Sequence, residues 1–185
     1  MNITRLTAAV LSAAALFSVG CSTYRESGGT PLNDTYFVSQ AENTVSKFKM
    51  NDPSMAKFFS DSYGYAVFPK VTKGGAGIGA AHGEGGVVYE RGTHVGFAEV
   101  TQVTVGAQLG GQSFSQIVFF QNAASFGDFK NSRTKFSGNA SAVLSKSGGA
   151  ASADYQDGVA VFVAPISGAM LEASIGGQEF KYRAK

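Results

Sequence analysis

The spacing of apolar residues near the start of the chain predicts a helical segment. Phe37, Ala41, Val45 and Phe48 recur every three or four positions, which places them on one face of an α-helix. The sequence Asn51-Asp52-Pro53 is expected to end this helix. Pro53 can begin a second short helix, because proline is tolerated in the first helical turn.

From Tyr63 onward the pattern changes to one that is typical of β-strands. Residues 63–68 form an aromatic and β-branched run that Pro69 is expected to stop. Residues 103–110 alternate between apolar and small or polar side chains, which is the period of a half-buried strand. The runs 115–120 and 159–164 indicate buried strands.

A short interruption of this β-rich region predicts another helix. Ala123, Phe126 and Phe129 have helical spacing, so we expect a short helix near 122–130. The chain then returns to β-type sequence, including a run at 169–175 and a strand around Phe180.

Glycine decides the expected shape of the sheet. The chain has 24 glycines, and 12 of them lie between Gly74 and Gly111. Glycine weakens a strand unless the strand must bend or approach another backbone closely. We therefore predict an α+β fold in which an N-terminal helical segment packs on a curved, glycine-rich, antiparallel and barrel-like sheet. Gly106 and Gly110 share one strand face, and we expect a neighbouring element to crowd that face.

The first residues predict export. Arg5 precedes an apolar stretch over residues 6–19, which is too short to span a bilayer stably and is typical of a signal peptide. Gly20 and the single cysteine, Cys21, follow. This arrangement resembles the lipobox of bacterial lipoproteins, although Ser18 stands where leucine is usual. The alternative is ordinary signal cleavage beside an incidental cysteine.

The lipoprotein resemblance implies a domain organisation and a location. Residues 1–20 would be the signal peptide, residues 21–32 the acylated Cys21 and a flexible tether, and residues 33–185 a single domain. Ser22 stands where retention in the inner membrane usually requires aspartate. We therefore expect a lipid anchor in the outer membrane, with the domain facing the periplasm.

Composition and motifs exclude several classes of function. Hydrophobic residues make up 44% of the chain, charged residues only 15%, and the net charge is +2, which argues against a disordered chain and against a nucleic-acid partner. The two histidines, His82 and His94, lack short metal-ligand spacing, and the glycine-rich stretch lacks the Gly-Lys-Ser/Thr of a phosphate-binding loop. We expect no enzyme, no catalytic residues, no metal and no cofactor.

Several sequence blocks, taken in order, resemble the SYLF domain family, which is also known for actin-binding members in yeast. They are YGYAVFPKV at 63–71, KGGAGIG at 73–79, GEGGVVY at 83–89, GAQLGGQ at 106–112 and ISGAMLEASIGG at 166–177. Met170 and Glu172 depart from the usual aromatic residue and glycine of the last block. The resemblance covers roughly residues 40–181.

The resemblance implies a lipid-binding module, because eukaryotic members are associated with phosphoinositides, membrane remodelling and actin. For a bacterial envelope we expect anionic phospholipid as the partner and do not expect actin. The resulting hypothesis is a periplasm-facing lipoprotein that binds membrane phospholipid without catalysis. The alternative is a structural or interaction module that recruits another envelope protein and uses lipid only as its anchor.

Cations beside aromatic residues are the candidate lipid contacts, because such pairs suit a membrane interface. The headgroup candidates are Lys130, Arg133, Lys135, Lys70 and Lys73. The membrane-contact candidates are Phe37, Val45, Phe48, Phe129 and Phe136. The alternative for both sets is that the aromatic residues point into the core and the cations lie on an ordinary solvated surface.

Overall fold

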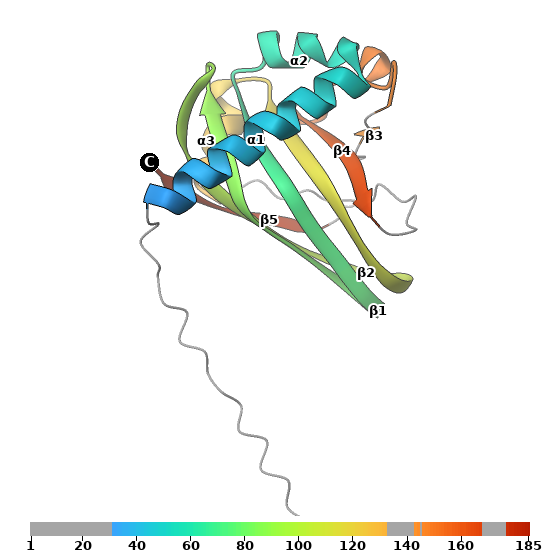
Figure 1. Ribbon diagram of the computed structural model, residues 1–185. Helices are drawn as coiled ribbons and strands as arrows, with labels where there is room; N and C mark the ends of the chain where they lie inside the picture. Colours follow the sequence, from blue (N-terminus) through green and yellow to red (C-terminus); the bar gives the residue numbers. More distant parts are fainter. Residues whose placement is uncertain (1–30, 133–142, 145, 168–176) are drawn as a thin grey trace, which may run out of the picture.

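The computed structural model describes residues 31–132, 143–144, 146–167 and 177–185 (Figure 1). The fold is α+β, as predicted from the sequence. Its helices are α1 (Pro31–Asn51), η1 (Pro53–Met55), α2 (Ala56–Asp61), α3 (Ala123–Lys130) and η2 (Ala150–Ser152). Its strands are β1 (Gly64–Glu90), β2 (Thr93–Phe120), β3 (Val143–Leu144), β4 (Val159–Ser167) and β5 (Gln178–Ala184).

The helical segments follow the sequence signals closely. Helix α1 ends at Asn51, and Asp52 caps the following turn by accepting a hydrogen bond from the backbone N–H of Ser54. Pro53 occupies the first position of η1, as expected. Asn122 caps α3 by accepting hydrogen bonds from the backbone N–H groups of Ala124 and Ser125, which satisfies donors that the first helical turn leaves free.

Strands β1 and β2 form one long antiparallel hairpin instead of the several shorter strands that the sequence suggested. They pair from Glu90 and Thr93 beside the turn to Gly64 and Phe120 at the far end. Arg91 and Gly92 both have positive φ, which suits the tight turn between them. Pro69 does not stop β1. It lies in a register shift between Phe68 and Val71 on an outer strand, where its missing N–H interrupts no ladder.

The two halves of β2 have different neighbours on the edge away from β1. Residues from Ser113 to Phe120 pair with β4, and residues from Gly96 to Gln102 pair with β5, both antiparallel. At the end of β4, Ser167 pairs with Ser113 of β2. At the start of β5, Gln178 pairs with Gln102 of β2 in the same register. The short strand β3 pairs in parallel with β4, which differs from the purely antiparallel sheet that was expected.

The sheet is strongly curved but not closed into a barrel. A 27-residue strand such as β1 would extend about 90 Å if it were straight. Instead the backbone N–H of Arg91, just after β1, donates a 2.9 Å hydrogen bond to the carbonyl oxygen of Tyr63, just before it. The strand therefore bends back on itself. Within the described residues the outer strands β1 and β3 do not pair with each other.

The curvature produces two hydrophobic cores, one on each face of the sheet. The inner core lies inside the curve and includes Phe68, Phe120 and Phe180, and α3 adds Phe126 and Phe129. The outer core lies beneath α1 and α2, which cross the outer face (Figure 1). Its main members are Ala41, Phe48, Met55, Phe58, Val67, Val87, Phe97, Ile117, Phe119 and Phe162.

The glycines permit close packing, but not where the sequence suggested. A Cβ atom at Gly110 would meet nothing within 4 Å, so the expected crowding is wrong for that residue, although its φ of +128° still disfavours a side chain. Gly106 lies among residues whose side-chain surroundings are not described. The crowding occurs instead at Gly86, where a Cβ atom would lie 2.5 Å from the Phe68 ring and 2.8 Å from the Ala98 carbonyl oxygen.

Candidate functional site

A groove of about 520 Å³ runs between α1 and the outer face of the sheet. Helix α1 forms one wall, and β1, β2 and β4 form the floor and the other wall. The lining residues of α1 are Tyr36, Phe37, Gln40, Asn43, Thr44, Lys47, Phe48 and Asn51. Those of the sheet are Pro69, Lys70, Glu84, Ser115, Ala164, Pro165 and Ile166.

The helical wall exists because the apolar face of α1 packs on the sheet. Phe48 is 1% exposed and belongs to the outer core, and Phe37 and Val45 are partly buried against the same core. The Phe37 ring lies directly over Gly85, where any side chain would collide with it. Thr44 is buried and turns its hydroxyl back to the Gln40 carbonyl oxygen at 2.8 Å.

The floor of the groove is shaped by the register shift in β1. Pro69 and Lys70 lie within that shift, and Lys70 is exposed. The Ser115 hydroxyl donates a 2.7 Å hydrogen bond to the Pro69 carbonyl oxygen, which fixes the shifted backbone against β2. Beside Ser115 lies Ala164 of β4, and Ile166 lies two residues further along, with 53% of its surface exposed.

The charges around the groove leave two lysines available to a ligand. Lys47 and Lys70 are both exposed, and neither forms an ion pair with any described residue. Glu84 is the acidic group of the lining, and His82 lies 3.8 Å from its carboxylate. The groove therefore carries one more positive than negative charge, and its lysines are free to meet an anion.

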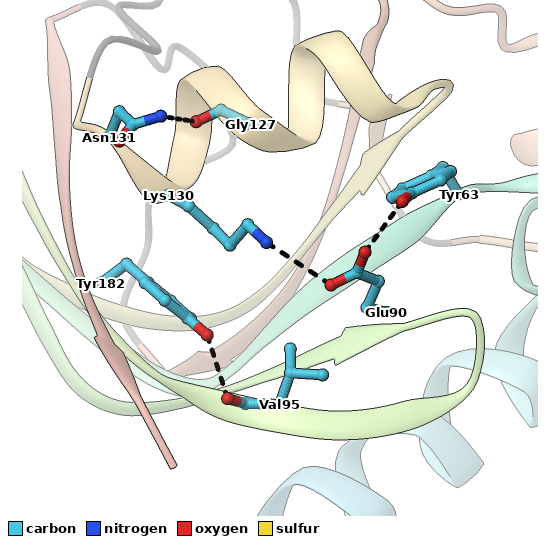
Figure 2. Close-up of polar contacts among 7 residues, drawn as sticks. All are labelled: Tyr63, Glu90, Val95, Gly127, Lys130, Asn131 and Tyr182. Atoms are coloured by element: carbon cyan, nitrogen blue, oxygen red, sulfur yellow. Dashed lines mark hydrogen bonds and ion pairs between the residues drawn. The ribbon is translucent and has the colours of Figure 1, made fainter.

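The headgroup candidate Lys130 lies at a different place, beside the hairpin turn (Figure 2). Its ammonium lies 3.5 Å from Glu90 and 4.8 Å from the centre of the Phe126 ring. The Tyr63 hydroxyl donates a 2.8 Å hydrogen bond to the other oxygen of Glu90. This bond, followed by the Lys130 charge, lowers the pKa of Glu90 below its usual value despite partial burial, and the same bond raises the pKa of Tyr63. Lys130 thus already has a partner.

The structure corrects three of the predicted contacts. Phe129 is fully buried in the inner core and Phe48 is buried in the outer core, so neither reaches a membrane surface in this conformation. Lys73 is only 2% exposed, because it faces the interior of the curved sheet, so it is not a surface headgroup contact. The alternative interpretation of these aromatic residues, as core residues, holds for Phe48 and Phe129.

Other predicted residues fall outside the described part of the chain. Cys21, Arg133, Lys135 and Phe136 belong to this group, as does the apolar run at 169–175. Among the helices that are described, none combines the length and the apolar character that a membrane span requires. In the same residues no group of three or more His, Cys, Asp or Glu side chains is placed to hold a metal ion.

Sequence reasoning found part of the groove and missed the rest. Phe37, Phe48 and Lys70 were candidates, and the structure brings all three to one site. Tyr36, Lys47 and Ile166 were missed, although they are exposed and line the same groove. Their signal is weak in the sequence, because nothing local shows that residue 166 of a late strand faces the first helix.

Comparison with known proteins gives a distant relative. No family model matches the chain. Over 149 residues the chain is 25% identical to beta cell expansion factor A of Aeromonas veronii, in an alignment that covers 77% of this chain and 54% of that protein. The chain therefore spans about half the length of the curated relative that it matches.

Proposed function

We propose that this protein is a noncatalytic, SYLF-like lipid-binding lipoprotein of the bacterial envelope. The observation that carries the proposal is the groove beneath α1, which unites Phe37 of α1, Lys70 of β1 and Ile166 of β4 from separate parts of the sequence. Aromatic and aliphatic walls beside free lysines are the chemistry that an anionic phospholipid requires. The ordered blocks of SYLF-like sequence support the same function.

Two exposed apolar side chains suit contact with a membrane. Tyr36 is 59% exposed and Ile166 is 53% exposed, and they lie on the helix and strand walls of the groove. An aromatic ring at such a position can enter the headgroup layer while Lys47 and Lys70 meet phosphate. Each cation near an anionic surface contributes about 1 kcal/mol, so the two lysines together favour anionic over neutral lipid by about thirtyfold.

In this proposal the anchor and the groove act together. Acyl chains on Cys21 would hold the protein in the outer membrane with its domain facing the periplasm, since stable anchoring needs two or more chains. The change Cys21→Ser should then move the protein from the membrane fraction to the soluble fraction of cells. Unchanged membrane fractionation of this variant would place the anchor elsewhere or make the domain alone a strong membrane binder.

The direct test is co-sedimentation of the unacylated chain, residues 22–185, with vesicles. We expect binding to vesicles that contain phosphatidylglycerol or cardiolipin, weaker binding to pure phosphatidylcholine, and a steep decrease with added salt. The alternative function, recruitment of another envelope protein with lipid only as anchor, predicts no vesicle binding by this chain. Absence of binding to anionic vesicles at low salt would contradict the proposal and favour that alternative.

A further inference from the structure

We propose that the groove beneath α1 binds the acyl chain of one individual anionic lipid molecule. The chain would lie along α1, and the acidic headgroup would lie between Lys47 and Lys70. This inference rests on the proposed function and goes beyond it, because contact with a membrane surface does not require a lipid to enter the protein. It names the ligand class as a lipid monomer with an anionic head.

The dimensions of the groove fit an acyl chain. Its lining on α1 extends from Tyr36 to Asn51, which corresponds to about 22 Å along a helix that rises 1.5 Å per residue. The chains of one bilayer leaflet span about 15 Å, half of a hydrocarbon core of about 30 Å. The groove is therefore long enough for one chain and a headgroup, and its volume of about 520 Å³ lies within the range of small-molecule sites, about 300–1,000 Å³.

The chemistry of the lining is divided as an amphiphile requires. Phe37, Ala164, Pro165 and Ile166 supply apolar surface on both walls, and the buried Phe48 holds the helical wall against the sheet. Ile166 is exposed although it follows a buried stretch of β4, so its apolar side chain is available to a ligand in the groove. An acyl chain would cover this surface, whereas a purely polar ligand would leave it in water.

The charges select the headgroup. Lys47 of α1 and Lys70 of β1 both line the groove, one from the helix and one from the sheet, and no described residue forms an ion pair with either. Lys130, in contrast, is held by Glu90 at 3.5 Å. A phosphate between Lys47 and Lys70 would gain two cations at once, while the nearby Glu84 would oppose it. Charge complementarity therefore favours an anionic head over a zwitterionic one.

The inference is tested by titration calorimetry of the unacylated chain, residues 22–185, with monoacyl phosphatidylglycerol below the concentration at which it forms micelles. We expect saturable binding of one lipid molecule per protein. Monoacyl phosphatidylcholine should bind more weakly, because its choline cation offsets the charge of the phosphate and is repelled by the two lysines. Glycerophosphoglycerol, which has the same head without a chain, should not bind measurably.

Variants locate the site. Ile166→Asp should weaken binding of monoacyl phosphatidylglycerol at least tenfold, whereas Val103→Asp, at an equally exposed apolar residue outside the groove, should not. The double change Lys47→Gln and Lys70→Gln should weaken it about thirtyfold, whereas Lys181→Gln, an exposed lysine on β5, serves as the control. Glu84→Gln should strengthen binding. Equal effects of Ile166→Asp and Val103→Asp would overturn the site.

Vesicle co-sedimentation of the same proteins separates this inference from the proposed function. Binding to anionic vesicles without binding of the monoacyl lipid would overturn the groove site and leave membrane binding intact. Binding of the monoacyl lipid without binding to vesicles would support the groove site and contradict membrane binding. Equal affinity for the choline and glycerol heads would overturn the role given to the two lysines.

Discussion

The side-chain amides of Gln116 and Gln178 donate to and accept from each other, with both hydrogen bonds at 3.0 Å. The backbone of Gln178 pairs with Gln102, far along the same strand β2 from Gln116, and its amide also donates to the Gln102 side chain at 3.0 Å. All three glutamines are at most 2% exposed. One side chain of β5 therefore joins the two halves of β2 inside the curve of the sheet.

Gln178→Leu should reduce stability by removing this connection. The change leaves the buried Gln116 amide without this partner, and an unsatisfied buried polar group costs about 1–3 kcal/mol. We expect the free energy of unfolding, measured in urea, to fall by at least about 1 kcal/mol. The neighbouring exposed change Glu179→Gln should stay within about 0.5 kcal/mol of the wild type. If the Gln178→Leu variant is equally stable, the amide bridge does not stabilise the curved sheet.

Adding Gln116→Leu to Gln178→Leu provides an internal check on the same bridge. The second change removes the amide that the first one left without its partner, so the double variant should be more stable than the sum of the two single losses predicts. Strictly additive losses would show that the two side chains do not act as a pair.

Asp52 should make stability depend on acidic pH. Burial alone would raise the pKa of this carboxyl group, but hydrogen bonds from Ser54, Ala150 and Gly148 outweigh it and lower the pKa below its usual value of 3.8. A lowered folded-state pKa means that the carboxylate stabilises the fold above the unfolded-state pKa and loses this contribution as the pH falls through the folded-state pKa.

The measurement is urea unfolding of the wild type and Asp52→Ala between pH 7 and pH 2. At neutral pH the variant should be less stable by about 1–3 kcal/mol, because it leaves buried N–H groups without an acceptor. The difference between the two proteins should shrink below about pH 4. A difference that stays constant down to pH 2 would show that the ionised carboxylate is not the stabilising species.

Two glycine changes should have opposite effects on stability. Gly86→Ala places a Cβ atom against the Phe68 ring and the Ala98 carbonyl oxygen, and overpacking of this kind costs about 1–3 kcal/mol. Gly127→Ala lies in α3, where a Cβ atom meets nothing within 4 Å, and alanine favours a helix over glycine by about 1 kcal/mol. Thermal unfolding should therefore show a lower Tm for the first and a higher Tm for the second. The same direction of change in both would contradict this packing.

Lys130 forms an ion pair with Glu90, so we expect it to contribute to vesicle binding only when that ion pair is broken. Because the pKa of Glu90 is lowered, its carboxylate stays ionised at neutral pH and holds the Lys130 ammonium. If Lys130 contacts headgroups, Glu90→Gln should strengthen binding to phosphatidylglycerol vesicles several-fold and Lys130→Gln should weaken it. Unchanged binding by both variants would remove Lys130 from the lipid-binding surface.

Local periodicity was sufficient to predict α1 and α3, whereas the short helix η2 was not predicted. The spacing of Phe37, Ala41 and Phe48 identified α1, and that of Ala123, Phe126 and Phe129 identified α3, because a helix buries residues that are near in sequence. The concentration of glycine also predicted curvature. The fold class could therefore be inferred before any contact between distant residues was known.

The interior polar residues and the groove could not be predicted in this way. Lys73, Gln102 and Gln116 are polar residues in alternating strands, and the pattern gives no reason to place them inside. They are buried because the hairpin folds over on itself, which depends on pairing between distant residues. Ile166 and Lys47 meet at the groove for the same reason, since a late strand and the first helix come together only in the tertiary fold.

The single turn at Arg91 and Gly92 also bears on how quickly this sheet can form. Pairing of β1 with β2 can begin at Glu90 and Thr93 and extend one residue at a time toward Gly64 and Phe120. Each new pair then closes only a small additional loop, so the entropy of bringing distant residues together is spread over many small steps. The register shifts along the hairpin are the points at which this extension must skip a residue. Contacts far apart in sequence should therefore form faster than their separation suggests, with pauses at the bulges.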